Sequence, residues 1–340
     1  MRFPKVVGVL AGLSLLMSAC GDDAPSTTAT TAPTATTVDE PEEDEPVDEP
    51  AVDEPAEDEP AEDEPADEAA DDTGAGDVPT RIVSLSPTHT EMLFAIGAGD
   101  QVVAVDEFSN HPEAAAEKMT DLSGFAPNVE AIGSYEPDLV VTDGTNPDLL
   151  DQLDSLGIPH WEGPAAVTFD DVYDQIEQLG EATGNDDAAT ELVSSMQAEI
   201  DEIAAEVAEL DEPLTYYHEL DNTFFSVTSD TFVGYVYSQL GLRSIADLAE
   251  GSGGPYPQLN AEFILSEDPD LIYLACTTYC SESAETVAAR DGWDELSAVQ
   301  NGLVIELDDD ISSRWGPRIV DFYRQIAEGV ESLVEIDPAA

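Results

Sequence analysis

From residue 81 onward, apolar and polar positions follow a strand-then-helix order. Short apolar runs rich in β-branched residues predict four buried strands, at 81–85, 102–105, 138–142 and 158–161. Helical spacing predicts four helices between and after them, at 86–99, 111–119, 128–134 and 147–157. Because strands and helices alternate, this part of the chain predicts an α/β lobe with a mostly parallel sheet.

The helix predicted at 86–99 has local signals at both ends. Thr88 and Glu91 have the spacing of a capping box, and Pro87 suits a first helical turn. Gly97 and Gly99 end the pattern. We therefore expect Thr88 and Glu91 to serve the start of this helix.

A helical stretch without strands follows, predicted at 168–184 and 186–210. The second helix has apolar residues at three-to-four spacing, at Leu192, Met196, Ile200, Ile203 and Val207. About 25 residues at 1.5 Å each give roughly 35–40 Å. We expect this helix to bridge two lobes; a coiled-coil seam is the weaker alternative.

The strand-helix alternation then restarts after Pro213. Strands are predicted at 214–220, 270–276 and 303–307, and helices at 231–241, 260–267 and 316–333. The same phrase also occurs in both halves: NVEAIGSYEPDL begins at Asn128 and NAEFILSEDPDL at Asn260. Seven positions recur at a spacing of 132 residues. The repeat predicts one helix–break–strand module in each of two similar lobes.

The N-terminus has a different pattern. Arg2 and Lys5 precede a short apolar run that is too short to span a membrane and is typical of a secretory signal. Cys20 directly follows two small residues, which resembles the lipobox of bacterial lipoproteins. We therefore expect lipidation at Cys20, with residues 1–20 as the signal segment and an extracytoplasmic, membrane-anchored protein.

Residues 21–78 have the composition of a tether. A Thr- and Pro-rich run precedes Asp39 to Asp72, where 20 residues are acidic and none is Lys or Arg. Such a segment buries too little apolar surface to offset the entropy of ordering, and its charges repel one another. The sequence predicts a disordered spacer there.

Acidity continues beyond the tether. From Arg81 the chain has 53 acidic and seven basic residues, a formal charge of −46. This balance makes nucleic acid and anionic membrane poor partners, so membrane contact is expected through the lipid anchor only.

Two cysteines remain when Cys20 is set aside. Cys276 and Cys280 enclose the short sequence CTTYC, and outside the cytoplasm they are able to form a disulfide. We predict that disulfide, with free thiols as the alternative.

Motifs of catalysis, phosphate binding and dinucleotide binding are absent from the sequence, and its four histidines lack metal-ligand spacing. We expect no enzyme, no cofactor and no directly bound metal.

The loops that follow the predicted strands instead carry aromatic, amide and hydroxyl groups, and ligands of α/β sheets bind at those strand ends. Such loops suit a cleft for one large, partly apolar organic ligand.

The motifs in these loops resemble a known family. RIVSLSPTHTEMLFAIGAGDQVVAVDEFSNHP, GFAPNVEAIGSYEPDLVV, PYPQLNAEFILSEDPDLIYL and SSRWGPRIV occur here in the order and spacing of the solute-binding proteins of ABC importers for cobalamin and ferric siderophores. The resemblance covers about 81–330. It implies two βα-repeat lobes joined by one long rigid helix, with the ligand cleft between them.

The resemblance also suggests site residues. In the cobalamin branch an aromatic residue precedes Pro-Gln, and Tyr256 has that place here. We expect flat apolar contacts from Phe125, Tyr256, Tyr279 and Trp315, and polar contacts from Ser109, Asn110 and Arg314. His111 is a candidate axial ligand of a bound metal chelate. Glu130 and Glu262 have equivalent places in the repeat, and in such proteins one glutamate of each lobe pairs with arginines of the permease.

The expected protein is thus a monomeric binding component that delivers a ligand, a corrinoid first, to a permease dimer and its ATPase. A ferric siderophore or haem is the alternative ligand; an enzyme and a passive surface protein are the rival classes. The expected division is a first lobe at 79–167, a helical connector at 168–212 and a second lobe at 213–340.

Overall fold

The computed structural model describes residues 78–207, 213–249 and 254–336, all within one compact unit, Ala69–Ala340. The signal segment, Cys20 and the acidic tether up to residue 77 lie outside the described residues, so the expectations for them remain sequence predictions. No helix among the described residues is both long enough and apolar enough to cross a membrane.

The first lobe is built on a four-stranded parallel sheet in the order β2-β1-β3-β4. The strands are β1 (Ile82–Ser84), β2 (Val102–Val105), β3 (Leu139–Thr142) and β4 (His160–Glu162). The helices that alternate with them are α1 (Pro87–Ala95), α2 (Glu113–Ala116), α3 (Val129–Gly133) and α4 (Pro147–Leu156). Strands β1 and β3 are buried along their whole length, which explains their continuous apolar sequence.

The second lobe repeats this topology with a parallel sheet in the order β6-β5-β7-β8. Its strands are β5 (Leu214–Glu219), β6 (Leu242–Ser244), β7 (Leu271–Leu274) and β8 (Val304–Glu306). Its helices are α7 (Phe232–Ser238), α8 (Ala261–Glu267), α9 (Ala284–Ala288), α10 (Ser297–Gln300) and α11 (Ile319–Ile336). The sequence pattern missed β6, α9 and α10, which have only three to five residues each.

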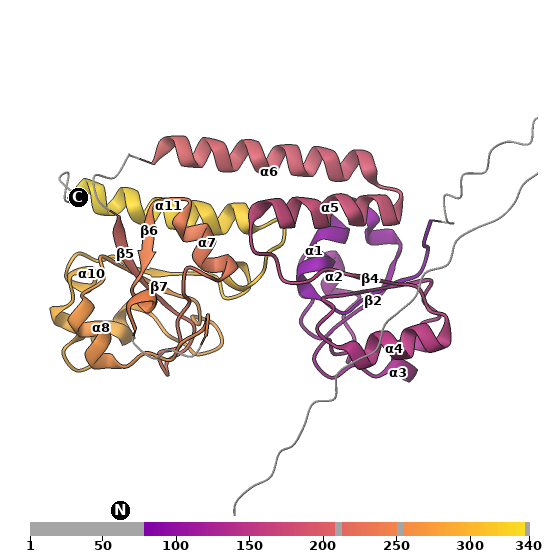
Figure 1. Ribbon diagram of the computed structural model, residues 1–340, viewed down its shortest axis with the longest axis horizontal. Coiled ribbons are helices and arrows are strands. Elements are labelled where there is room, and N and C mark those ends of the chain that lie inside the picture. Colours follow the sequence, from indigo (N-terminus) through magenta and orange to yellow (C-terminus); the bar gives the residue numbers. More distant parts are fainter. Residues whose placement is uncertain (1–77, 208–212, 250–253, 337–340) are drawn as a thin grey trace, which may run out of the picture. The chain divides into compact units, whose positions relative to one another are not determined.

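Along the sequence, two helices follow the first sheet and precede the second: α5 (Phe169–Thr183) and α6 (Asp186–Glu206). Helix α6 runs along both lobes as predicted, and α5 and α11 pack against it (Figure 1). Its 21 residues correspond to about 31 Å at 1.5 Å per residue. The lobes are therefore joined by α6 together with α5 and α11.

The hydrophobic core continues through this junction. One cluster of buried side chains contains members from α1, from α5 and α6, from α11 and from the second sheet. A smaller cluster covers the other face of the first sheet, around Val83, Val140 and Leu153. We call the larger cluster the shared core.

The start of α1 differs from the prediction. Its N-cap is Ser86, whose side chain caps no backbone N–H, and Pro87 is the first helical residue. Thr88 and Glu91 do not form the expected capping box, because Glu91 binds arginines far away in the sequence. A capping box does occur at the start of α5, between Thr168 and Asp171.

The repeated phrase folds alike in the two lobes. The side chain of Asn128 accepts hydrogen bonds at the start of α3, and that of Asn260 does so at the start of α8. After each helix one residue adopts a left-handed conformation, Glu136 with φ 50° and Asp268 with φ 43°. The chain then turns into β3 or β7.

The repeated aspartates give each module its tie to the central strand. Asp138 accepts a hydrogen bond from the backbone N–H of Thr80 at 2.8 Å, just before β1. Asp270 accepts one from the N–H of Thr215 at 2.7 Å, in β5. Each carboxylate also accepts from the threonine hydroxyl. The sequence repeat is thus a repeat of hydrogen bonds as well as of helix and strand.

Candidate functional site

Exposed aromatic side chains lie on loops of both lobes. Phe125 of the first lobe is 83% exposed, and its ring meets that of Phe108 edge to face at 6.0 Å. In the second lobe, Tyr256 is 54% and Tyr279 68% exposed. Exposed rings of this kind suit the binding of a flat, partly apolar partner.

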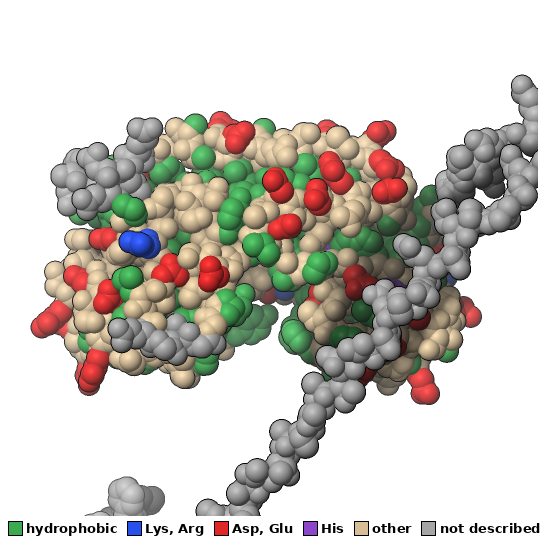
Figure 2. Space-filling view, in the orientation of Figure 1, with side chains coloured by type: hydrophobic (Ala, Val, Ile, Leu, Met, Phe, Trp, Pro, Cys, Tyr) green, Lys and Arg blue, Asp and Glu red, His purple; other side chains and the backbone are tan. Residues whose placement is uncertain are grey.

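A small pocket brings three of the expected ligand residues together. Tyr256, Arg314 and Trp315 of the second lobe line it, and so do Ala165 and Ala166, which follow β4. Its volume is about 90 Å³, whereas drug-sized ligands occupy pockets of about 300–1,000 Å³. The pocket therefore accommodates only a side group of a larger ligand. Figure 2 shows a hollow between the lobes with hydrophobic side chains on both of its sides.

Arg314 is also bonded to the first lobe through its guanidinium group. One guanidinium nitrogen donates to Glu91 at 2.8 Å and to Asn110 at 3.0 Å. The other donates to the carbonyl of Phe108 at 3.1 Å and to Asp310 at 2.7 Å. Both terminal nitrogens thus have protein acceptors, and through them Arg314 joins the two lobes; its contact with a ligand stays a prediction.

Asn110 takes part in the same contacts. Its amide nitrogen donates to Asp310 at 2.7 Å, while its carbonyl oxygen accepts from Arg314. Asn110 is exposed at the edge of this cluster. Its polar groups were expected to face a ligand, and in this structure they face the second lobe.

Glu91 is the centre of these contacts and was missed as a site residue. Its side chain is only 3% exposed and also accepts two hydrogen bonds from Arg318. Glu91, Asn110, Asp310, Arg314 and Arg318 form what we call the interlobe cluster. Only the local spacing to Thr88 drew attention to Glu91, because its partners lie 223 and 227 residues further along the chain.

Trp315 is anchored beside this cluster. Its indole N–H donates to Gln175 of α5 at 3.1 Å, and the same amide oxygen lies 3.0 Å from Nε2 of His89. The other ring nitrogen of His89 lies 2.8 Å from the hydroxyl of Ser86. Burial lowers the pKa of His89 to about 4, so the ring is neutral near pH 7. A neutral ring that donates from Nε2 and accepts at Nδ1 satisfies both neighbours.

Ser109 was expected to contact the ligand, but it is buried in the structure. It has no exposed surface, and its hydroxyl lies 2.9 Å from that of Thr90. In this structure Ser109 therefore offers no surface to a ligand. His111, in contrast, is exposed on the same loop. No group of three or more His, Cys, Asp or Glu side chains in the described ranges has the arrangement of a metal site.

The CTTYC loop is fixed at several points. Cys276 and Cys280 form a disulfide. The buried carboxylate of Asp309 accepts from the backbone N–H groups of Thr277 at 2.7 Å, Thr278 at 3.1 Å and Tyr279 at 3.0 Å. Three consecutive N–H groups around one carboxylate hold the loop to the end of β8. The exposed ring of Tyr279 is thus presented on a well-supported loop.

Glu130 and Glu262 are both exposed in the first turn of their helices, α3 and α8. Figure 1 shows these two helices on the side of the molecule opposite α6. The structure thus displays one glutamate per lobe in matching local settings.

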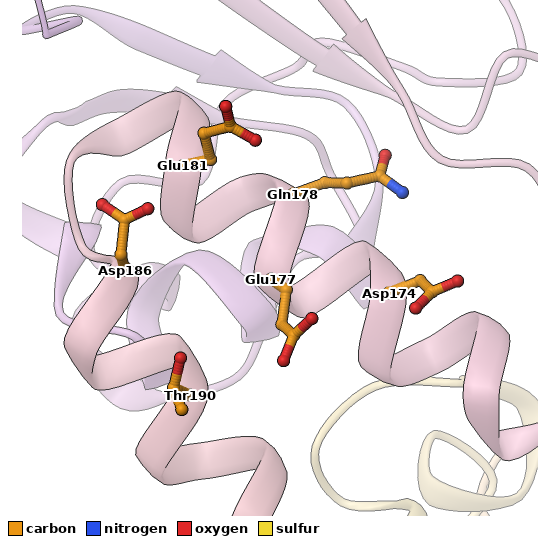
Figure 3. A pocket seen from close by; sticks show the side chains of 6 residues that line it. All are labelled: Asp174, Glu177, Gln178, Glu181, Asp186 and Thr190. Carbon is orange, nitrogen blue, oxygen red and sulfur yellow. The ribbon is translucent and has the colours of Figure 1, made fainter.

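A separate groove lies between α5 and α6, lined by Asp174, Glu177, Gln178, Glu181, Asp186 and Thr190 (Figure 3). Figure 2 shows further carboxylates gathered over the same helices. The groove contains none of the expected ligand residues, and its mutually repelling carboxylates do not suit a partly apolar ligand.

The family model described as periplasmic binding protein matches residues 82–311, which contain both sheets and most of the loops described above. The chain belongs to this family. Among relatives of this family, a Bacillus subtilis protein named as an uncharacterized ABC transporter substrate-binding lipoprotein, YvrC, is 32% identical over 260 residues, 74% of this chain and 80% of the relative. A Halobacterium salinarum protein named as a cobalamin-binding protein is 30% identical over 251 residues, 72% of this chain and 67% of the relative.

A solved structure supports the fold as well. The periplasmic vitamin B12 binding protein BtuF of Vibrio cholerae superposes with a TM-score of 0.62 at 28% identity, over 75% of this chain and 97% of that protein. The family consists of solute-binding proteins, which agrees with the sequence expectation of a binding protein with two parallel-sheet lobes.

Proposed function

We propose that this protein captures a corrinoid in the cleft between its lobes and delivers it to an ABC permease. The observations that support this most are the exposed rings on loops of both lobes, Phe125, Tyr256 and Tyr279, and the hollow between the lobes. Stacking and area burial of such rings favour a large flat ligand. Relatives named for cobalamin or vitamin B12 binding point to the same ligand class.

The fluorescence of Trp315 should report ligand binding. Its indole lies at the pocket, whereas Trp293 is buried in the second lobe. Titration with cyanocobalamin, haemin and a ferric siderophore, followed by tryptophan fluorescence and by calorimetry, tests the proposal. We expect saturable one-to-one binding of cyanocobalamin. Binding of haemin or the siderophore alone would move the assignment to the alternative ligand, and binding of none would contradict the proposal.

We further propose that the chain acts at the outer face of the membrane. Cys20 carries the lipid anchor, residues 21–78 form the tether, and the lobes at 79–167 and 213–340, with the connector at 168–212, form the binding unit. Glu130 and Glu262 dock to matching arginines of the two permease subunits. The repeat supports this docking, because a twofold-symmetric permease presents two equal surfaces and the chain displays one equivalent acid on each lobe.

A further inference from the structure

The loop between β8 and α11 carries a dense set of contacts to the first lobe. Within residues 310–318, Asp310, Arg314 and Arg318 make six hydrogen bonds to Glu91, Phe108 and Asn110. Trp315 of the same loop adds its bond to Gln175. A single short loop of the second lobe is thus seated on the first.

Charge within this contact is balanced. Two guanidinium groups, of Arg314 and Arg318, face two carboxylates, of Glu91 and Asp310. The Arg314 side chain is 9% exposed and that of Glu91 3%, so water competes little with this ion pair. When one partner of a buried ion pair is removed, the other is left as an uncompensated charge. Loss of the Glu91 charge would therefore take from Arg318 the carboxylate it is paired with and leave Arg314 with Asp310.

The contact also determines where the ligand surface lies. Arg314 and Trp315 line the pocket together with Ala165 and Ala166, but Glu91 does not. Movement of the loop away from the first lobe would separate the two sides of this pocket. Glu91 is therefore able to influence ligand binding without touching the ligand.

We propose that Glu91 is a positioning residue that holds the loop 310–318 against the first lobe and so sets the spacing of the two lobes. Retention of the ligand is the consequence, and this second part rests on the proposed function. Spreading of the lobes requires the interlobe cluster to separate, so its strength governs how readily the cleft releases what it holds.

The test compares Glu91→Gln with Glu219→Gln in the full-length protein. Glu219 is also buried and accepts two hydrogen bonds from an arginine, Arg290, but that pair lies within the second lobe. Backbone hydrogen exchange is followed by mass spectrometry. In Glu91→Gln we expect amides of 106–111 and 310–318 to exchange about tenfold faster or more, with the strands of both sheets unchanged. In Glu219→Gln these two segments should exchange as in the wild type.

A double variant distinguishes two effects of Glu91→Gln: the loss of contact between the lobes and the burial of an unpaired charge. Glu91→Gln with Arg318→Gln removes one charge of each sign, so it restores the charge balance without restoring the contact. We expect it to be more stable to heat than Glu91→Gln, because no unpaired charge is buried, but to keep the faster exchange. Unchanged exchange of 310–318 in both variants, within about twofold of wild type, would overturn the proposal.

Dissociation of cyanocobalamin supplies the second readout. We expect the off-rate to increase about tenfold in Glu91→Gln and to stay unchanged in Glu219→Gln. Faster exchange with an unchanged off-rate would overturn the link to retention. If the wild type binds no cyanocobalamin, the proposed function fails for this ligand, while the exchange data still decide whether Glu91 positions the loop.

Discussion

Tyr256 of the second lobe lines the pocket and is 54% exposed. Burial and stacking of one aromatic face on a ring ligand contribute about 1–3 kcal/mol. We therefore expect Tyr256→Ala to weaken cyanocobalamin binding by about ten- to hundredfold. Calorimetry measures the change, with Leu156→Ala on the exposed surface of α4 as a control that should bind normally. An unchanged dissociation constant for Tyr256→Ala would remove this residue from the site.

The buried histidines give the protein an acid-sensitive stability. Burial lowers the pKa of His89 to about 4 and that of His218 to about 3. Below about pH 6.5 the unfolded chain takes up these protons while the folded protein does not, so stability falls as the pH drops toward those values. At pH 5 each histidine costs about 2 kcal/mol relative to pH 7 or above.

Urea unfolding at pH 7 and pH 5 measures this loss. His89→Gln should lose about 2 kcal/mol less than the wild type over that interval, whatever its stability at pH 7. Leu156→Ala, at an exposed position without a titratable side chain, should lose as much as the wild type. Equal losses in all three proteins would show that His89 takes no part in the acid response.

At the scale of elements, the repeated modules predict the contact with a permease. Glu130→Arg combined with Glu262→Arg should abolish ligand uptake in cells, because each lobe then presents a positive charge to the proposed arginines. Folding should change little, since a charge in the first turn of a helix is worth about 0.3–1 kcal/mol. Ligand affinity should also remain. The matched control is Glu177→Arg with Glu181→Arg on α5, shown in Figure 3, which should transport normally. Uptake that survives the first reversal would leave both glutamates with a local helix role only.

The sequence predicted elements well where their signals are local. Asn128 and Asn260 cap their helices as the repeat suggested, and the long apolar pattern located α6. The role of Glu91 was not predictable in the same way, because its partners are distant in sequence and the nearby Thr88 offered a plausible local reading. Strand β6 was missed because Leu242 is followed by Arg243 and Ser244, so its three residues form no apolar run.

On the scale of the whole molecule, we expect the lipid anchor to determine where the protein is located and the lobes to determine what it binds. Cys20→Ala should release the protein from the membrane fraction, because the thiol that receives the lipid is gone. Fractionation followed by mass measurement of the released chain tests this, and a variant that stays in the membrane with unchanged mass would contradict the lipoprotein proposal.

Deletion of 39–72 should leave the protein in the membrane and its ligand affinity unaltered, since the spacer is expected to carry no part of the cleft.

The shared core has a consequence for how the protein melts. Its buried side chains run from α1 through α5, α6 and α11 into the second sheet, so neither lobe is able to lose its packing without exposing apolar surface of the other. The lobes should consequently denature in a single cooperative transition, with calorimetric and van't Hoff enthalpies of equal size. A fragment that ends after α4 would lack the helices that cover one face of its sheet and should aggregate. Two halves that repeat one topology are thus one thermodynamic unit.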